Sequence, residues 1–227
     1  MKELNGGGAS RSYNQYCAVA RALDLVGERW TLLIIRDLLL GPRRYKDLLD
    51  GLPGIGTNLL ADRLRELEKL ALVQRSVLPP PAGSAVYELT EAGQELEPVI
   101  AAMGRWGARF LGAPRETDRF PTSAYFVAMR VMFRPEAAAE LTETYELWVD
   151  GHVFEVRVDN GQLVTREGRA HAPRAVMTMD VRTLLALLKE GLQPRDALAS
   201  GRLKLDGDPQ ALERFFGLFS SAVPSPA

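Results

Sequence analysis

The stretch "GLPGIGTNLLADRLRELEKLALVQRS", residues 51–76, contains a helix whose two faces differ in character. A step of about 100° per residue places Leu64 and Leu67 within about 40° of Leu60, so the three leucines share one face. The opposite pole of the same helix carries four polar residues, Asn58, Asp62, Arg65 and Lys69. This pattern predicts a helix over residues 57–70 with one buried stripe and one free face.

The segments on either side of this helix define the fold of the first half. Apolar periodicity predicts earlier helices over residues 17–27, 28–41 and 44–51, of which the second is apolar nearly all round and should be central to the core. Alternation predicts strands over residues 72–78 and 85–90, joined by the proline-rich loop "PPPAGS". Thr90 should cap a long helix that Pro98 kinks. This order predicts a winged helix-turn-helix, in which "LPGIG" forms the turn.

The free face of the predicted recognition helix suits duplex DNA. The small residues Gly56 and Thr57 allow the helix end to approach the backbone, and Asn58 could pair with adenine for about 1–3 kcal/mol of discrimination. The alternative is that these polar residues are only solvated surface groups. A helix with one leucine stripe is most often a surface helix that packs through its leucines and binds nothing. The predicted DNA contacts are Arg43, Arg44, Lys46, Gly56, Thr57, Asn58, Ala61, Asp62, Arg65, Lys69 and Arg75.

Composition sets further bounds on the class of protein. The formal net charge is −1, and the mild basic excess over residues 29–75 permits nucleic-acid binding without requiring it. One cysteine, Cys17, excludes an intramolecular disulfide framework and a cysteine-based metal cluster. We expect no membrane span and no secretory signal, so the predicted compartment is the cytoplasm, and we predict no cofactor and no metal.

The second half changes to a period of two. Three predicted strands are joined by Asp150-Gly151 and Asn160-Gly161, dipeptides typical of tight hairpins. A fourth strand, a helix over residues 181–191, a fifth strand and a closing helix that begins at Pro209 follow. The predicted fold class is α+β, with an N-terminal winged helix-turn-helix and a C-terminal five-stranded, mainly antiparallel sheet packed with helices. The predicted parts are an arm (1–16), the winged helix domain (17–111), a linker (112–122) and the second domain (123–221).

The first half resembles the HxlR-type family of bacterial transcriptional regulators. The segments that carry the resemblance are "CAVARALDLVGERWTLLIIRDLLLGPRRYKDLL", "LPGIGTNLLADRLRELEKLALVQR" and "YELTEAGQELEPVIAAMGRWGARF". The resemblance implies a homodimer joined through the first helix and the long helix after the wing, with each recognition helix in a major groove. The wing tip "PPPAGSAVY" departs from the family because it has no Arg or Lys, which puts a minor-groove contact in doubt and leaves Arg75 as the nearest cation.

The same resemblance suggests a role for Cys17. Several regulators of this type sense oxidants or electrophiles through a cysteine at the start of the first helix, which is the place of Cys17. A thiol at a helix N-terminus is more often ionised and therefore more reactive. The alternative is a small, half-buried apolar residue in the dimer interface.

The second half resembles a sterol-carrier-protein-type lipid-binding domain. The resemblance rests on "YELWVDGHVFEVRVDNGQLV", "VMTMDVRTLLALLKEG" and "ALASGRLKLDGDPQALERFFGLF", and implies an apolar tunnel between the sheet and its helices. Met and aromatic residues are common on adaptable binding surfaces, although residue by residue a filled core is the commoner outcome. The predicted ligand contacts are Phe126, Met129, Met132, Phe133, Trp148, Met177, Met179, Leu185, Leu188, Phe215, Phe216 and Phe219.

These patterns predict a homodimeric transcriptional regulator whose operator affinity changes when a hydrophobic small molecule binds the second domain. The first alternative is a regulator that senses redox state or electrophiles through Cys17, with a purely structural second domain. The second alternative is a lipid carrier with a vestigial helix-turn-helix. No nucleophile–base pair or paired carboxylates are evident, so we do not expect an enzyme.

Overall fold

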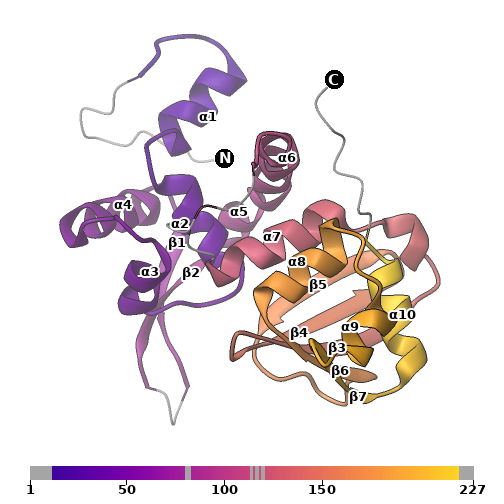
Figure 1. Ribbon diagram of the computed structural model, residues 1–227. Helices are drawn as coiled ribbons and strands as arrows, with labels where there is room; N and C mark the ends of the chain where they lie inside the picture. The colour runs from indigo at the N-terminus through magenta and orange to yellow at the C-terminus, as the bar shows by residue number, and fades with distance from the viewer. Residues whose placement is uncertain (1–11, 80–82, 113–114, 116–117, 119–120, 220–227) are drawn as a thin grey trace. The chain divides into compact units, whose positions relative to one another are not determined.

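The computed structural model describes residues 12–79, 83–112, 115, 118 and 121–219 (Figure 1). The chain divides into two compact units, Met1–Ile100 and Ala101–Ala227. Within the described part, no helix is both long and apolar enough to cross a membrane.

The first unit is a winged helix-turn-helix, as the sequence predicts. Its helices are α1 (Ala18–Val26), α2 (Thr31–Leu38), α3 (Tyr45–Gly51) and α4 (Thr57–Lys69). The wing is the antiparallel pair β1 (Val73–Val77) and β2 (Ala85–Leu89), and the tip residues 80–82, with the predicted stiff loop, lie outside the described residues. The long helix is interrupted into α5 (Glu91–Gln94) and α6 (Glu97–Ala108), next to Pro98 as predicted, and α6 begins in the first unit and ends in the second. Thr90 caps α5 by accepting a hydrogen bond from the Gly93 backbone.

The core of this unit lies where α2, α3 and α4 meet. Ile34 and Ile35 of α2 and Leu48 of α3 are fully buried. Helix α2 is central to this core, as predicted, although its apolar residue Leu33 is 41% exposed. Helix α2 has eight residues, and its neighbours cover only part of its circumference. The side that carries Leu33 therefore faces solvent.

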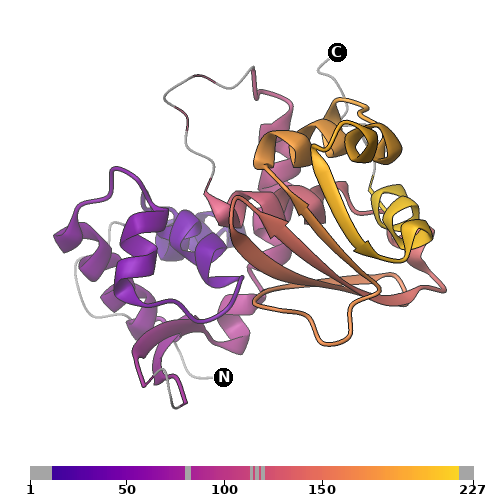
Figure 2. The same ribbon diagram turned by 60° about the horizontal axis from the view of Figure 1, so that its bottom comes forward.

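The second unit is built on a five-stranded sheet of order β5-β4-β3-β6-β7 (Figure 2). Its strands are β3 (Thr142–Val149), β4 (His152–Asp159), β5 (Gln162–Glu167), β6 (Ala175–Met179) and β7 (Leu203–Gly207). Three of the four strand pairs are antiparallel, while β3 and β6 are parallel. The helical elements are α7 (Thr122–Met132), the 3-10 turn η1 (Pro135–Ala138), α8 (Val181–Lys189), α9 (Pro194–Ala199) and α10 (Pro209–Gly217).

Aromatic contacts show that α7 and α10 cover the same face of this sheet. Phe126 of α7 meets Phe154 with ring centroids 4.2 Å apart, and Phe215 of α10 meets Tyr145 at 4.8 Å. Leu147 pairs with Phe154 and lies two residues from Tyr145, so all these strand residues point to one face. An apolar layer therefore lies between the sheet and these two helices.

The two tight turns in this unit have the backbone conformation that the sequence predicts. Asp150 and Gly151 have φ of 49° and 82°, and Asn160 and Gly161 have φ of 46° and 80°. Positive φ at both central residues matches the right-handed twist of the strands, which keeps β3, β4 and β5 in one meander.

Candidate nucleic-acid interface

Helix α4 is held by its leucine stripe and leaves its opposite face in solvent. Leu60, Leu64 and Leu67 are at most 1% exposed. The remaining predicted contacts of this helix are exposed except for Ala61, which is half-buried: Thr57, Asn58, Asp62, Arg65 and Lys69. The structure therefore brings the predicted reading residues together along one side of one helix.

The turn before α4 fixes how its N-terminus is presented. Gly54 has φ of 94°, a conformation that favours glycine, and Ile55 anchors the turn with only 8% exposure. The Tyr45 hydroxyl donates a hydrogen bond of 2.6 Å to the Thr57 carbonyl and joins α3 to the first turn of α4. Gly56 is the N-cap, and no described side chain caps the free N–H groups there. Such an end can accept a phosphate.

The two arginines of α4 have different surroundings. The side chain of Arg63 is 15% exposed and bonds to Glu28 at 2.9 Å and to Glu66 at 2.5 Å, which ties the helix to the body of the unit. The side chain of Arg65 is 61% exposed and forms an ion pair with Asp62, three residues earlier on the free face. Of these two arginines, only Arg65 lies on the free face of α4.

The other predicted basic contacts lie around this helix. Arg43 forms an isolated bridge with Tyr87 of β2 and is half-buried, whereas Arg44 is exposed at the N-cap of α3. Lys46 lies in the first turn of α3, and it is exposed. These positions are compatible with contacts to the phosphate backbone, which orient a protein without reading sequence.

Arg75 at the base of the wing is engaged within the domain. Its Nε lies 2.8 Å from Glu68 Oε1, and its guanidinium lies 5.1 Å from the centre of the Tyr87 ring. Burial raises the pKa of the Tyr87 phenol, and the Arg75 charge opposes this increase. Arg75 is thus a partnered cation, and a contact with DNA would have to compete with Glu68.

Cys17 lies where the sequence places it, at the N-cap of α1, and its side chain is exposed.

Exposed apolar residues follow on α1, where Val19 is 68% and Leu23 45% exposed. A second exposed apolar row follows α6 and the residues just beyond it, namely Val99, Met103, Trp106, Phe110 and Leu111. These residues are not among the predicted contacts, although the spacing of three and four from Val99 to Phe110 is the signal of one helix face.

The predicted ligand residues of the second unit fall into two groups. Eight are buried in the layer between helices and sheet: Phe126, Met129, Met132, Met177, Met179, Leu188, Phe215 and Phe219. Four are only half-buried: Phe133, Trp148, Leu185 and Phe216. Trp148 is not part of the layer, because it alternates with Leu147 and Val149 and its ring lies under Arg169 on the opposite face.

Polar side chains of α7 and β5 lie beside this apolar layer. Arg130 of α7 donates to Thr165 Oγ1 at 3.4 Å, and Thr165 is 2% exposed. Burial lowers the pKa of the Arg130 guanidinium. Burial also raises the pKa of the nearby helix residue Tyr125 to about 12, with a further contribution from the charge of Asp150.

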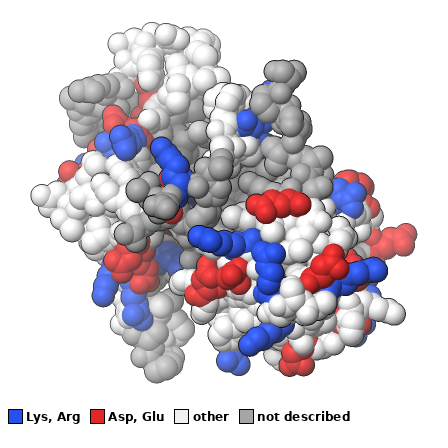
Figure 3. All heavy atoms as spheres, in the orientation of Figure 1, with Lys and Arg blue, Asp and Glu red and all other residues white. Residues whose placement is uncertain are grey.

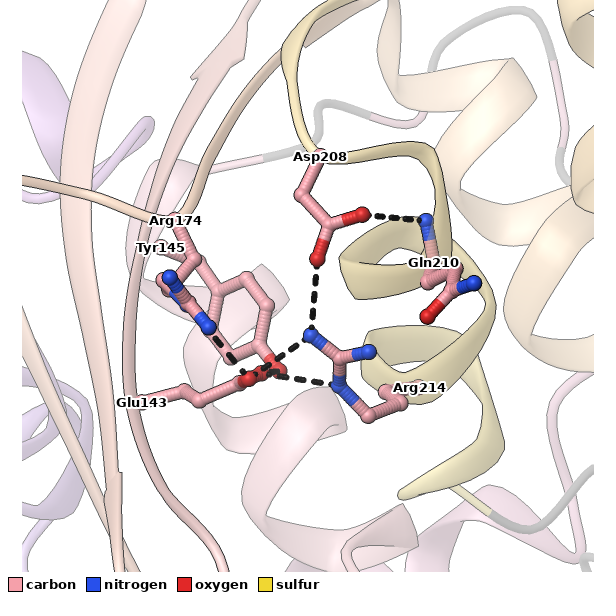
Figure 4. Close-up of polar contacts among 6 residues, drawn as sticks. All are labelled: Glu143, Tyr145, Arg174, Asp208, Gln210 and Arg214. Carbon is pink, nitrogen blue, oxygen red and sulfur yellow. Dashed lines mark hydrogen bonds and ion pairs between the residues drawn. The ribbon is translucent and has the colours of Figure 1, made fainter.

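A polar cluster that the sequence did not reveal joins α10 to the sheet (Figure 4). Arg214 donates to both carboxylate oxygens of Glu143, at 2.7 and 3.2 Å, and Nη2 also donates to Asp208 at 3.0 Å. The Tyr145 hydroxyl donates to Glu143 at 2.5 Å, and Arg174 lies 3.8 Å from the same carboxylate. The cluster spans residues far apart in sequence, so no spacing rule could have found it.

The protonation of this cluster follows from its hydrogen bonds. Burial alone would raise the pKa of Glu143, but the hydrogen bonds from Arg214 and Tyr145 outweigh it and the pKa is lowered. Asp208 caps α10 by accepting from the Gln210 backbone, which together with Arg214 lowers its pKa. Figure 3 shows Lys and Arg beside Asp and Glu on the visible face of the second unit, so this face presents mixed charge.

Each half of the chain is similar in sequence to a known protein family. Residues 25–115 match the sequence model of the HxlR-like helix-turn-helix family, and residues 112–225 match that of the alkyl sulfatase C-terminal domain. The HTH-type transcriptional regulator YodB of Bacillus subtilis is 42% identical over 89 residues, which are 39% of this chain and 80% of YodB. The HTH-type regulator sll1512 of Synechocystis is 39% identical over 95 residues, 42% of this chain and 70% of that protein.

A solved structure of YodB with a bound quinone is 38% identical, covers 40% of this chain and 97% of its own, and has a TM-score of 0.36. The helix order, the wing, the family model and the two sequence relatives define a helix-turn-helix transcriptional regulator. The chain belongs to the HxlR-like helix-turn-helix family through its first half, and its second half belongs to the alkyl sulfatase C-terminal domain family. The sterol-carrier-like resemblance of that half stays a prediction.

Proposed function

We propose that a homodimer of this chain binds operator DNA through α4, and that a hydrophobic small molecule in the second unit changes its operator affinity. The observation that carries the DNA-binding part is the geometry of α4. One face is buried by leucines, the other exposes Asn58, Asp62, Arg65 and Lys69, and no described side chain caps its N-terminus. A recognition helix of this class inserts such an end into the major groove.

Homodimerisation is supported by exposed apolar residues on two helices. Val19 and Leu23 on α1, and Met103 and Trp106 on α6, are 45–68% exposed. Trp106 also contacts Phe110, with ring centroids 4.9 Å apart, which makes a continuous apolar strip. Exposed apolar patches of this kind mark protein interfaces. A second copy would cover them and set two recognition helices about one turn of DNA apart.

The effector part of the proposal rests on the composition of the apolar layer in the second unit. Four methionines line it, and methionine side chains adapt to irregular ligands. The half-buried Arg130 and the buried Thr165 supply polar groups beside this layer, and a few polar groups among apolar ones are the usual make-up of a site for an apolar small molecule. A coupling free energy of about 1–3 kcal/mol would change operator affinity by about 5- to 150-fold.

Fluorescence anisotropy with duplex DNA over a salt series tests the DNA-binding part. We expect affinity to fall steeply with salt, because each phosphate contact releases counterions. Replacing both Asn58 and Arg65 by Ala should abolish sequence preference while the fold persists, since both side chains are exposed. Binding that is independent of salt would favour a carrier protein instead, and unchanged operator preference in the double variant would refute the assigned face.

Mass spectrometry of compounds that co-purify with the protein tests the effector part. We expect an apolar compound bound to the second unit, and its readdition should shift operator affinity by about 5- to 150-fold. The effector part of the proposal is refuted if the protein purifies free of ligand and no apolar compound changes its operator affinity. The DNA-binding part would still stand.

A second candidate function is favoured by the exposure of Cys17 at the start of α1. Quinones are electrophiles that react with thiolates, and the related YodB has been solved with a quinone bound. Alkylation of Cys17 should then weaken operator binding, and the Cys17→Ser variant should be insensitive to the reagent. Equal operator affinity before and after alkylation would exclude this sensing route.

A further inference from the structure

The exposed ion pair between Asp62 and Arg65 is an unusual feature for a surface that meets DNA. Arg65 Nη2 donates to Asp62 Oδ1, and the two side chains are 61% and 53% exposed respectively. Neither has another hydrogen bond or ion pair with a described residue. The pair is therefore held only by itself, on the face of α4 that is free of the domain.

The same helix contains a second pair with the same spacing but a different task. Arg63 pairs with Glu66, yet its side chain is 15% exposed and also reaches Glu28. That pair fastens α4 to the domain. The Asp62–Arg65 pair joins two residues of α4 and no other element, so both exposed side chains can meet a molecule that approaches the helix from outside.

A carboxylate on this face constrains how Arg65 can bind. DNA phosphates repel the Asp62 carboxylate, and this carboxylate also neutralises the positive charge of Arg65. The pair therefore adds little to the sequence-independent affinity for DNA. An arginine held by a carboxylate loses less side-chain freedom on binding, because its planar fork is already oriented. The N–H groups that Asp62 does not use can reach O6 and N7 of guanine, which is the commonest specific contact of arginine in the major groove.

We propose that Asp62 is a positioning residue that orients Arg65 to read one guanine in each half-site. This inference rests on the proposed function and assigns a base to one position of its operator. The same carboxylate lowers affinity for non-specific DNA, because it cancels one positive charge per protomer. Discrimination between operator and random DNA thus depends on how Arg65 is oriented toward one base pair, and not on a strongly basic surface.

Selection from a random duplex library, followed by sequencing, tests the assignment with the full-length protein. We expect the unaltered protein to require guanine at one position per half-site, by about 5- to 150-fold over the other bases. Arg65→Lys should keep the charge and lose this preference, since lysine lacks the bidentate fork. Asp62→Ala should lose the preference at the same position and bind random duplexes more tightly.

Glu66→Ala is the matched control, because it removes the same charge from the same helix and belongs to the Arg63 pair. It should leave the guanine preference intact. The inference is overturned if Asp62→Ala retains the preference, or if Asp62→Ala and Arg65→Lys alter different positions. A protein that shows no salt-dependent duplex binding at all overturns the proposed function as well, and this outcome is distinct from specific binding without guanine dependence.

Discussion

Arg63 Nη2 lies 2.9 Å from Glu28 Oε2, so helix α4 is tied to the loop between α1 and α2, 35 residues earlier in the chain. The same loop contains Trp30, whose φ of 81° is rare for a bulky residue. A Cβ on Gly54, in the turn before α4, would lie 3.7 Å from the Trp30 ring. The loop that follows α1 therefore contacts both α4 and its turn, which couples the position of α1 to that of the proposed recognition helix.

This relationship predicts different costs for two arginine substitutions on one helix. Arg63→Ala should lower the free energy of unfolding by about 1 to 2 kcal/mol, because it removes two ion pairs and a packed aliphatic stem. Arg65→Ala should change it by less than about 0.5 kcal/mol, because that side chain is 61% exposed. Urea unfolding of both variants measures the difference, and equal costs would contradict the tethering role of Arg63.

The exposed strip on α6 predicts that one charge will separate the proposed dimer. Trp106→Glu places a carboxylate at a residue that is 65% exposed, so the monomer should fold while the interface loses its central aromatic. Sedimentation velocity should show a dimer for the unaltered protein and a monomer for the variant. Arg105→Glu, on the flank of the same helix, is the charge control and should stay dimeric. A dimeric Trp106→Glu variant would place the interface elsewhere.

The cluster around Arg214 predicts acid-sensitive stability in the second unit. The pKa of Glu143 is lowered in the folded protein, so its contribution is complete above the unfolded value of about 4.3 and is lost as pH falls through the lower folded value. Arg214→Gln should melt at a lower temperature than the unaltered protein at pH 7. The difference in melting temperature should become smaller toward pH 3, because a protonated Glu143 no longer attracts the charge of Arg214.

Arg195→Gln is the control for this pH series. Arg195 pairs with Glu213 at 3.7 Å, and its side chain is 78% exposed, so this pair should matter little at any pH. A gap between Arg214→Gln and the unaltered protein that stays constant from pH 7 to pH 3 would show that Glu143 protonation is not the cause.

Local patterns explain why much of the fold could be predicted. The leucine period fixed which face of α4 is buried, and Asp150-Gly151 marked a turn because its positive φ is a local requirement. Helix α9 was missed, since six residues are too few to show a period. The parallel pairing of β3 with β6 was also beyond reach, because it depends on packing between distant segments.

The candidate site shows the same division between local and distant information. Periodicity placed Arg65 and Asp62 on one face, and the structure confirms their exposure. It could not show that Arg75 is paired with Glu68, because that contact depends on the angle between the wing and α4. Trp148 was assigned to the apolar layer by its residue type alone, and strand alternation in the register of β3 overrules that choice.

The two hairpin turns of the second unit predict unequal costs for the same substitution. Gly151 and Gly161 have φ of 82° and 80°, so alanine at either position suffers the same backbone strain, about 1 kcal/mol or more. A Cβ on Gly161 would also lie 3.2 Å from the Pro135 carbonyl oxygen, whereas nothing lies within 4 Å of one on Gly151. Urea unfolding should therefore show a larger loss for Gly161→Ala than for Gly151→Ala. Equal losses would mean that η1 yields to the added methyl group, and that strain at the turn alone sets the cost.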